Sequence, residues 1–244
     1  MKVNLLGAPI DALSMDDTVE RVEAFLAGDR PRRVITLNPE LLYRMQTERH
    51  LWDLVSRADL ITPDGIGIVW ACRVAGQPVP ERVTGIDLML RLAERAARDG
   101  RRVFLLGAAP GVADEAAERL TRRYPGLAMA GTHHGYFQPG EEENVFRLVR
   151  RARAEILFVA LGAPKQEIWI DRYLQVTGVR VAMGVGGSLD VLAGRARRAP
   201  EWSQRLHMEW LARLVMEPAR LKRQTVLPRF AWLVLKTYRL GRSR

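Results

Sequence analysis

The sequence predicts a Rossmann-like α/β fold, in which a mainly parallel sheet is covered by helices on both faces. Short, continuously apolar runs recur along the chain, as is typical of strands that are buried on both sides. Segments with helical spacing separate these runs, and strands that alternate with helices favour a parallel sheet. A strongly basic segment of a different pattern follows residue 194.

The first third of the chain supplies three strand and helix pairs. Ser14 and the acidic residues after it are typical of a helix start, and Gly28 ends the apolar spacing of that helix. Pro39 is placed to begin the next helix directly after an apolar run. The expected strands are residues 3–6, 33–38 and 59–63, and the expected helices are residues 14–28, 40–57 and 65–75.

The remaining body repeats the same alternation. Residues 82–87 are expected to form a loop, and residues 124–126 (Tyr-Pro-Gly) stop a helix. The most apolar run of the chain is residues 156–161. The expected strands are residues 102–106, 127–131, 156–161 and 179–185, and the expected helices are residues 88–99, 112–123 and 141–154. A further helix is expected to continue from the turn at residues 162–167 to Gln175, and a short one to follow residues 186–190 and end at Gly194.

Charge divides the chain into two parts. Residues 195–244 hold 13 of the 38 lysines and arginines but only three of the 28 acidic residues, so they carry the whole net charge of +10. We therefore expect an α/β body over residues 1–194 and a basic amphipathic helical tail over residues 195–244. The body can bury a sizeable core, because 48% of the 244 residues are hydrophobic.

The tail combines basic residues with aromatic ones, including Trp202, Trp210 and Trp232. This composition indicates an anionic membrane surface, although a nucleic-acid-binding module that tracks phosphates remains an alternative. No stretch approaches the roughly 20 apolar residues of a membrane-spanning helix, and residues 3–10 are too short for a signal peptide. With Cys72 as the single cysteine, inside an apolar run, we expect a cytoplasmic protein.

Asp64 is the first candidate for catalysis. The apolar run at residues 59–63 ends in Pro63, Asp64 and Gly65, which places a carboxylate at the carboxyl end of a strand. In open α/β sheets ligands bind at that edge. Thr36 and Asn38 are two residues apart, so they share one face of a strand or its end. The alternative is that Asp64 only caps the helix that follows.

Two glycine turns are candidate phosphate sites. Residues 184–189 (Gly-Val-Gly-Gly-Ser-Leu) and 162–166 (Gly-Ala-Pro-Lys-Gln) each follow an expected strand, and Lys165 adds a charge. The first turn lacks the third glycine of the dinucleotide fingerprint, so it favours a nucleotide-dependent oxidoreductase only weakly. Turns without a ligand remain the alternative. The chain has no Asp-x-Asp, no nucleophile elbow, no P-loop and no His/Cys cluster with metal-ligand spacing.

Six motifs in order along the chain closely resemble the WecG/TagA/CpsF glycosyltransferase family. They are residues 36–39, 63–67, 82–87, 135–137, 162–167 and 184–190, with residues 217–221 as a further match in the tail. The resemblance implies an inverting, metal-independent transfer, typically of N-acetylmannosamine from a UDP donor. The acceptor would be the C4 hydroxyl of N-acetylglucosamine on undecaprenyl diphosphate, in the synthesis of a teichoic acid linkage unit or a related polysaccharide.

The resemblance also implies roles for single residues. Asp64 would be the general base, with Thr36 and Asn38 beside it and Gln166 on a sugar. The residues expected to bind the donor are Arg82, Tyr136, Gly162, Lys165, Gly186, Gly187 and Asp190. Those expected to bind the acceptor diphosphate are Arg213, Arg220 and Arg223. Without a metal, backbone amides and cations must stabilise the leaving UDP.

The implied partners are the UDP-sugar, the polyprenyl-diphosphate-linked acceptor and an anionic membrane surface, with no cofactor and no nucleic acid. The protein would lie at the inner face of the cell membrane as a peripheral protein. The resemblance also implies that the body can self-associate into a homo-oligomer. The motifs leave open which sugar is transferred.

Overall fold

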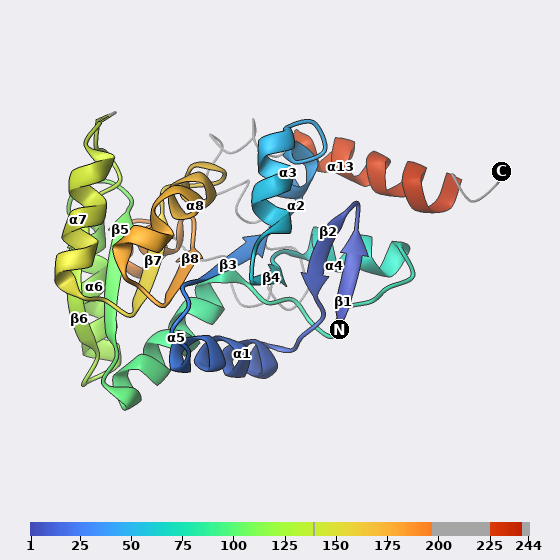
Figure 1. The fold of residues 1–244 in the computed structure, drawn as a ribbon. Coiled ribbons are helices and arrows are strands. Elements are labelled where there is room, and N and C mark those ends of the chain that lie inside the picture. Colours follow the sequence, from blue (N-terminus) through green and yellow to red (C-terminus); the bar gives the residue numbers. More distant parts are fainter. Residues whose placement is uncertain (139, 197–224, 241–244) are drawn as a thin grey trace.

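The computed structural model describes residues 1–138, 140–196 and 225–240 of the chain. Its centre is a six-stranded sheet with the order β4-β3-β8-β7-β5-β6, in which all neighbouring strands are parallel (Figure 1). The strands are β3 (Arg32–Leu37), β4 (Leu60–Pro63), β5 (Arg102–Gly107), β6 (Ala128–His133), β7 (Ile156–Ala160) and β8 (Val181–Gly184). The predicted fold class is therefore confirmed.

Helices cover both faces of this sheet, as the continuous apolar runs predict. One face packs against α1 (Met15–Ala27), α5 (Gly85–Asp99) and α6 (Val112–Arg123), and the other against α7 (Glu142–Ala152) and α8 (Lys165–Thr177). Strand β7 shows the alternation directly. Ile156 and Phe158 lie in the first core, and Leu157 and Val159 lie in the second.

A third core lies at the β4 end of the sheet. It contains the small antiparallel sheet of β1 (Lys2–Leu5) and β2 (Ala8–Asp11) together with α2 (Pro39–Arg44), α3 (Arg49–Ser56) and α4 (Ile66–Val74). The sequence analysis expected only one strand here. The hairpin turn is made by Leu6 and Gly7 in the left-handed region, and Gly7 N–H donates to Asn4 Oδ1.

Two predicted helix boundaries are wrong. The helix expected over residues 40–57 is divided into α2 and α3, and Thr47 Oγ1 donates to the carbonyl of Arg44 in the break, which competes with helical bonding. The loop expected over residues 82–87 already contains the first turn of α5. Thr84 caps that helix, because its side chain accepts a hydrogen bond from Asp87 N–H.

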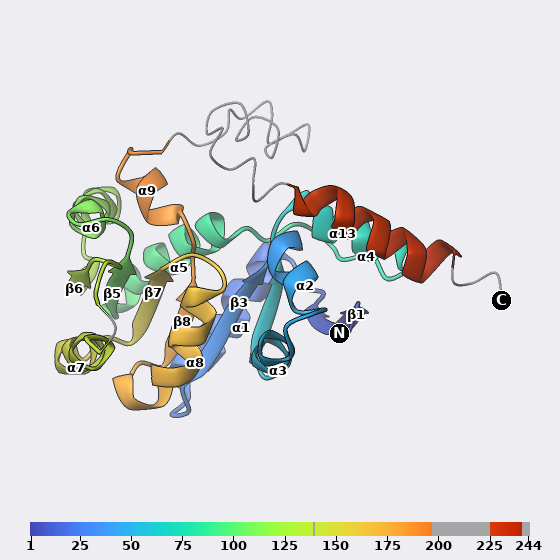
Figure 2. The same cartoon turned by 90° about the horizontal axis from the view of Figure 1, so that it is seen from above.

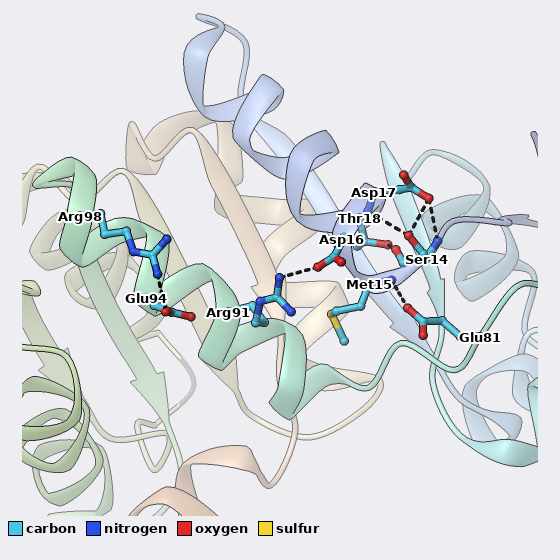
Figure 3. A network of polar contacts seen from close by, with 9 residues as sticks. All are labelled: Ser14, Met15, Asp16, Asp17, Thr18, Glu81, Arg91, Glu94 and Arg98. Carbon is cyan, nitrogen blue, oxygen red and sulfur yellow. Dashed lines mark hydrogen bonds and ion pairs between the residues drawn. The ribbon is translucent and has the colours of Figure 1, made fainter.

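The predicted start of the first long helix is confirmed, and polar contacts fix it to α5 (Figure 3). Ser14 and Asp17 form a capping box, in which each side chain accepts a hydrogen bond from the backbone N–H of the other. Arg91 of α5 pairs with Asp16, and Glu81 accepts from the N–H of Met15. These contacts hold α1 and α5 together on one face of the sheet.

The described end of the tail is α13 (Val226–Leu235), followed by a π-helix over Lys236–Leu240. α13 packs on α2 and α4 (Figure 2), and Phe230 and Val234 are buried in the third core. Tyr238 Oη accepts a hydrogen bond from Leu6 N–H at 2.8 Å. The division at residue 194 stays a prediction, but this helix shares its core with the body.

Two further features bear on the predictions for the chain. Across the described ranges, no helix combines the length and the apolar character needed to cross a membrane. Cys72 is fully buried, and burial raises the pKa of its thiol to about 11. The thiol is therefore neutral and shielded at pH 7.

Candidate active site

A cleft of about 1130 Å³ lies along the carboxyl ends of the parallel strands. Residues that directly follow β3, β4, β5, β7 and β8 line it, in agreement with the rule for open α/β sheets. The cleft brings together every body residue that the sequence analysis selected: Thr36, Asn38, Asp64, Arg82, Tyr136, Gly162, Lys165, Gln166, Gly186, Gly187 and Asp190. The sheet edge thus assembles residues that lie far apart in the sequence.

Asp64 lies in the turn between β4 and α4, and two glycines shape this turn. Gly65 has a φ of +93°, which a residue with a side chain adopts only with strain. A Cβ on Gly67 would lie 2.8 Å from Pro39 Cγ, so the missing side chain lets α4 approach α2. The N-cap position of α4 is occupied by Gly65, and Asp64 precedes it. The capping alternative for Asp64 is therefore not supported.

The Asp64 carboxylate is held instead by the start of α5. Asp64 Oδ2 accepts a hydrogen bond from Gly85 N–H at 3.3 Å. A Cβ on Gly85 would lie 3.3 Å from Thr36 Oγ1 and 3.6 Å from Asp64 Oδ2. Thr36 and Asp64 therefore border the same point, which stays open because residue 85 is a glycine.

Thr36 and Asn38 also form hydrogen bonds with the backbone of the protein, which the sequence analysis did not predict. Thr36 is buried, and its Oγ1 donates to the carbonyl of Gly184 at 3.2 Å. Asn38 is the N-cap of α2, since its Oδ1 accepts from Leu41 N–H at 2.9 Å. Each residue thus fixes one border of the cleft as well as lining it.

Gln166 joins α8 to the glycine turn after β8. Its Oε1 accepts from Gly186 N–H at 3.0 Å, and its Nε2 donates to Glu167 Oε1 at 2.8 Å. A Cβ on Gly184 would lie 2.5 Å from Gln166 Nε2, so the amide fits only against a glycine. Gly186 N–H is thus engaged by Gln166, and the expectation that the amides of this turn face a diphosphate stays a prediction.

Two basic side chains line the cleft from α8. Lys165 is the first residue of this helix, and Arg172 follows two turns later on the same face; both are exposed. The sequence analysis missed Arg172, although its spacing of seven residues from Lys165 is a usable signal.

Tyr136 is 72% exposed in the loop after β6. The N–H of Gly135 in that loop donates to the carbonyl of Ala108 at 2.8 Å, which holds the loop against the turn after β5.

Two further predictions concern metal ligands and the arginines expected to bind the acceptor. In the described part of the chain, no three His, Cys, Asp or Glu side chains are grouped closely enough to hold a metal ion. The expected acceptor arginines, Arg213, Arg220 and Arg223, lie outside the described residues.

Comparisons with known proteins give one consistent result. A sequence model of the "Glycosyl transferase WecG/TagA/CpsF family" matches residues 3–244. A Bacillus spizizenii protein named N-acetylglucosaminyldiphosphoundecaprenol N-acetyl-beta-D-mannosaminyltransferase is 36% identical over 234 residues, which cover 93% of this chain and 90% of that protein. Staphylococcus aureus proteins of the same name, from strains MW2 and MRSA252, are 35% identical over 240 residues, or 98% of this chain and 94% of theirs.

Proposed function

We propose a function from one premise: the chain belongs to the WecG/TagA/CpsF family of glycosyl transferases and is a hexosyltransferase. The reaction that we propose moves N-acetylmannosamine from UDP to the C4 hydroxyl of N-acetylglucosamine on undecaprenyl diphosphate. The relatives' names support the transferred sugar and the acceptor, and they specify a β-linked product. The resemblance in the six motifs supports the UDP donor and inversion at the anomeric carbon.

In this mechanism Asp64 is the general base. It takes the proton of the acceptor hydroxyl while that oxygen attacks the anomeric carbon and the bond from that carbon to the UDP oxygen breaks. The hydrogen bond from Gly85 N–H orients the carboxylate, and the absence of a side chain at Gly85 leaves room beside it for the hydroxyl. This arrangement of Asp64 in the cleft is the observation that carries the proposal.

The leaving UDP gains negative charge as the bond breaks, and this charge must be stabilised. Lys165 supports a role for α8 in this step, because a cation at a helix N-terminus is electrostatically unfavourable unless an anion binds there. Arg172 adds a second cation on the same helix face. We propose that these two side chains supply the charge without a metal ion, and that Arg213, Arg220 and Arg223 bind the acceptor diphosphate.

We also propose that the protein binds an anionic membrane surface at the inner face of the cell membrane. The outward face of α13 and of the π-helix that follows it supports this. Arg229 and Trp232 on α13, and Lys236 and Arg239 on the π-helix, recur at helical spacing and are exposed. Basic residues with an exposed tryptophan are typical of helices at membrane interfaces. Leu227 at the start of α13 lines the cleft, so this helix leads from the cleft to the proposed membrane contact.

A donor screen tests the proposed reaction. The full chain is incubated with UDP-N-acetylmannosamine, UDP-N-acetylglucosamine or UDP-glucose and with a short-chain lipid-linked N-acetylglucosamine, and the products are identified by mass spectrometry. We expect transfer from UDP-N-acetylmannosamine, and its loss in Asp64→Asn. Tight binding of NAD without binding of UDP would instead support the oxidoreductase alternative. Binding to single-stranded nucleic acid but not to anionic vesicles would support the nucleic-acid alternative.

A further inference from the structure

Glu167 is a carboxylic acid buried beside the cleft that no step of the proposed transfer uses. It is 2% exposed, and burial raises the pKa of its carboxyl above the usual range. Its Oε1 accepts from Gln166 Nε2, whereas its Oε2 has no hydrogen-bond partner within the described ranges. Burying a carboxyl that is only partly hydrogen-bonded costs folding free energy. Proteins keep a buried group that lowers stability mainly where a functional site requires that group.

The contact with Gln166 suggests what that requirement is. The side-chain amide of Gln166 has one accepting end and one donating end, so only one of its two orientations suits both of its neighbours. Gly186 N–H needs the oxygen, and Glu167 Oε1 needs the NH₂ group. Without the acceptor at Glu167, the amide is free to turn over and place its NH₂ group against Gly186 N–H, where two donors would repel each other.

The turn that this amide holds borders the cleft, in the part that we propose for the donor. Gly186 and Gly187 both line the cleft and directly follow β8 and Val185. Gly184 packs against the same amide and also accepts the hydrogen bond from Thr36. The orientation of Gln166 therefore sets the position of the glycine turn relative to the part of the cleft that holds Asp64.

We propose that Glu167 is a positioning residue for the donor: it fixes the Gln166 amide, and Gln166 in turn fixes the Gly186–Gly187 turn in the shape that receives the UDP diphosphate. This inference rests on the proposed function for the identity of the donor. It assigns Glu167 no contact with the substrate. Its effect is on donor binding rather than on acceptor binding.

A double-mutant cycle in the full chain tests this coupling. UDP affinity is measured by titration calorimetry for the wild type, Glu167→Met, Gln166→Met and the double variant. We expect each single change to weaken UDP binding about tenfold, the size of one lost hydrogen bond in a preformed site. The double variant should also be about tenfold weaker rather than a hundredfold, because both residues act through one contact. The KM for the donor should rise while the KM for the acceptor stays constant.

Two further variants separate positioning from general stability. Glu167→Gln keeps an accepting oxygen for Gln166 Nε2 and should recover the affinity lost in Glu167→Met. Thr177→Val is the matched control, since Thr177 is a buried polar residue of the same helix whose hydroxyl donates to the carbonyl of Leu174. It should lower the free energy of unfolding and leave UDP affinity unchanged.

Each outcome decides the inference. Additive effects of the two changes, or a folded Glu167→Met with wild-type UDP affinity, would overturn it. If Glu167→Met does not fold, the other two variants decide. Unchanged UDP affinity in Gln166→Met, or a tenfold loss of UDP affinity in Glu167→Gln, would contradict the coupling. A wild type that does not bind UDP would instead contradict the proposed donor, and so the proposed function itself.

Discussion

Asp64 accepts a hydrogen bond from the backbone N–H of Gly85, which lies 21 residues later in the chain and begins α5. This contact orients the carboxylate at the end of β4 beside Thr36, at a point that only a glycine leaves open. Asp64 was considered either as a general base or as the cap of α4. The cap of α4 is Gly65, so the base is the role that remains. The following predictions start from this arrangement.

Replacing Asp64 by asparagine should remove the base and keep the shape of the site. We expect kcat to fall by about two to four orders of magnitude, the usual contribution of a general base, with UDP affinity close to that of the wild type. Steady-state kinetics and calorimetry measure the two quantities. Asp53→Asn is the control for the lost charge, since Asp53 is a half-exposed carboxylate on α3. Near-normal turnover in Asp64→Asn would remove Asp64 from catalysis.

The proposed transfer needs no divalent metal ion. We expect the rate of sugar transfer to be unchanged in excess EDTA, because Lys165 and Arg172 supply positive charge along the cleft. A radiochemical transfer assay with and without EDTA measures this. Activity that is lost in EDTA and restored by Mg²⁺ or Mn²⁺ would show that metal ligands exist which neither the sequence motifs nor the described contacts identify.

The exposed basic and aromatic face that α13 shares with the following π-helix should control membrane binding. Reversing Arg229 and Lys236 to glutamate should weaken binding to anionic vesicles by about thirtyfold or more, since each basic residue at such a surface contributes on the order of 1 kcal/mol. Co-sedimentation with vesicles at two salt concentrations measures the effect. The control reverses Arg147 and Arg151 on α7, which lies at the opposite end of the molecule (Figure 1). Equal losses in both pairs would mean that net charge alone determines binding.

α13 should also stabilise the body. Phe230 is 2% exposed in the third core, so Phe230→Ala should lower the free energy of unfolding by about 3–5 kcal/mol. Trp232→Ala, on the exposed side of the same helix, should change it by no more than about 0.5 kcal/mol. Urea unfolding measures both. A chain that ends at Gly194 loses the same packing and should be less stable than the full chain. A negligible effect of Phe230→Ala would show that the body is stable without α13.

Glu167 should make stability depend on pH. At about pH 4 the Glu167 carboxyl is mostly protonated in both the folded and the unfolded chain. Its titration therefore adds little difference between the unfolding free energies of the wild type and Glu167→Gln at that pH. As pH rises, the unfolded chain releases the proton first, because burial, with a smaller effect of Glu40, raises the pKa in the folded state. The wild type should therefore lose stability relative to Glu167→Gln as the pH rises from about 4 to about 7. Parallel urea curves at the two pH values would contradict a raised pKa.

The sequence by itself determined the fold class and most of the cleft. Apolar runs that alternate with amphipathic segments identify a parallel sheet, and the carboxyl ends of its strands must meet at one edge. Asp64 could be found for this reason alone. Helix starts such as Ser14 were also readable, because a cap depends on residues only a few positions apart. Such signals are local, so they can be recognised in a single sequence.

The tertiary structure decided which of these elements are partners. Thr36 donates to a carbonyl 148 residues later, and Tyr238 accepts from an N–H 232 residues earlier. β8 lies between β3 and β7, and Phe230 of the tail enters the core of the body. Apolar periodicity shows which face of an element is buried but not which neighbour buries it, because hydrophobic attraction has no direction. The partner is chosen only when all elements pack together, and that choice placed Gln166 between Glu167 and the glycine turn.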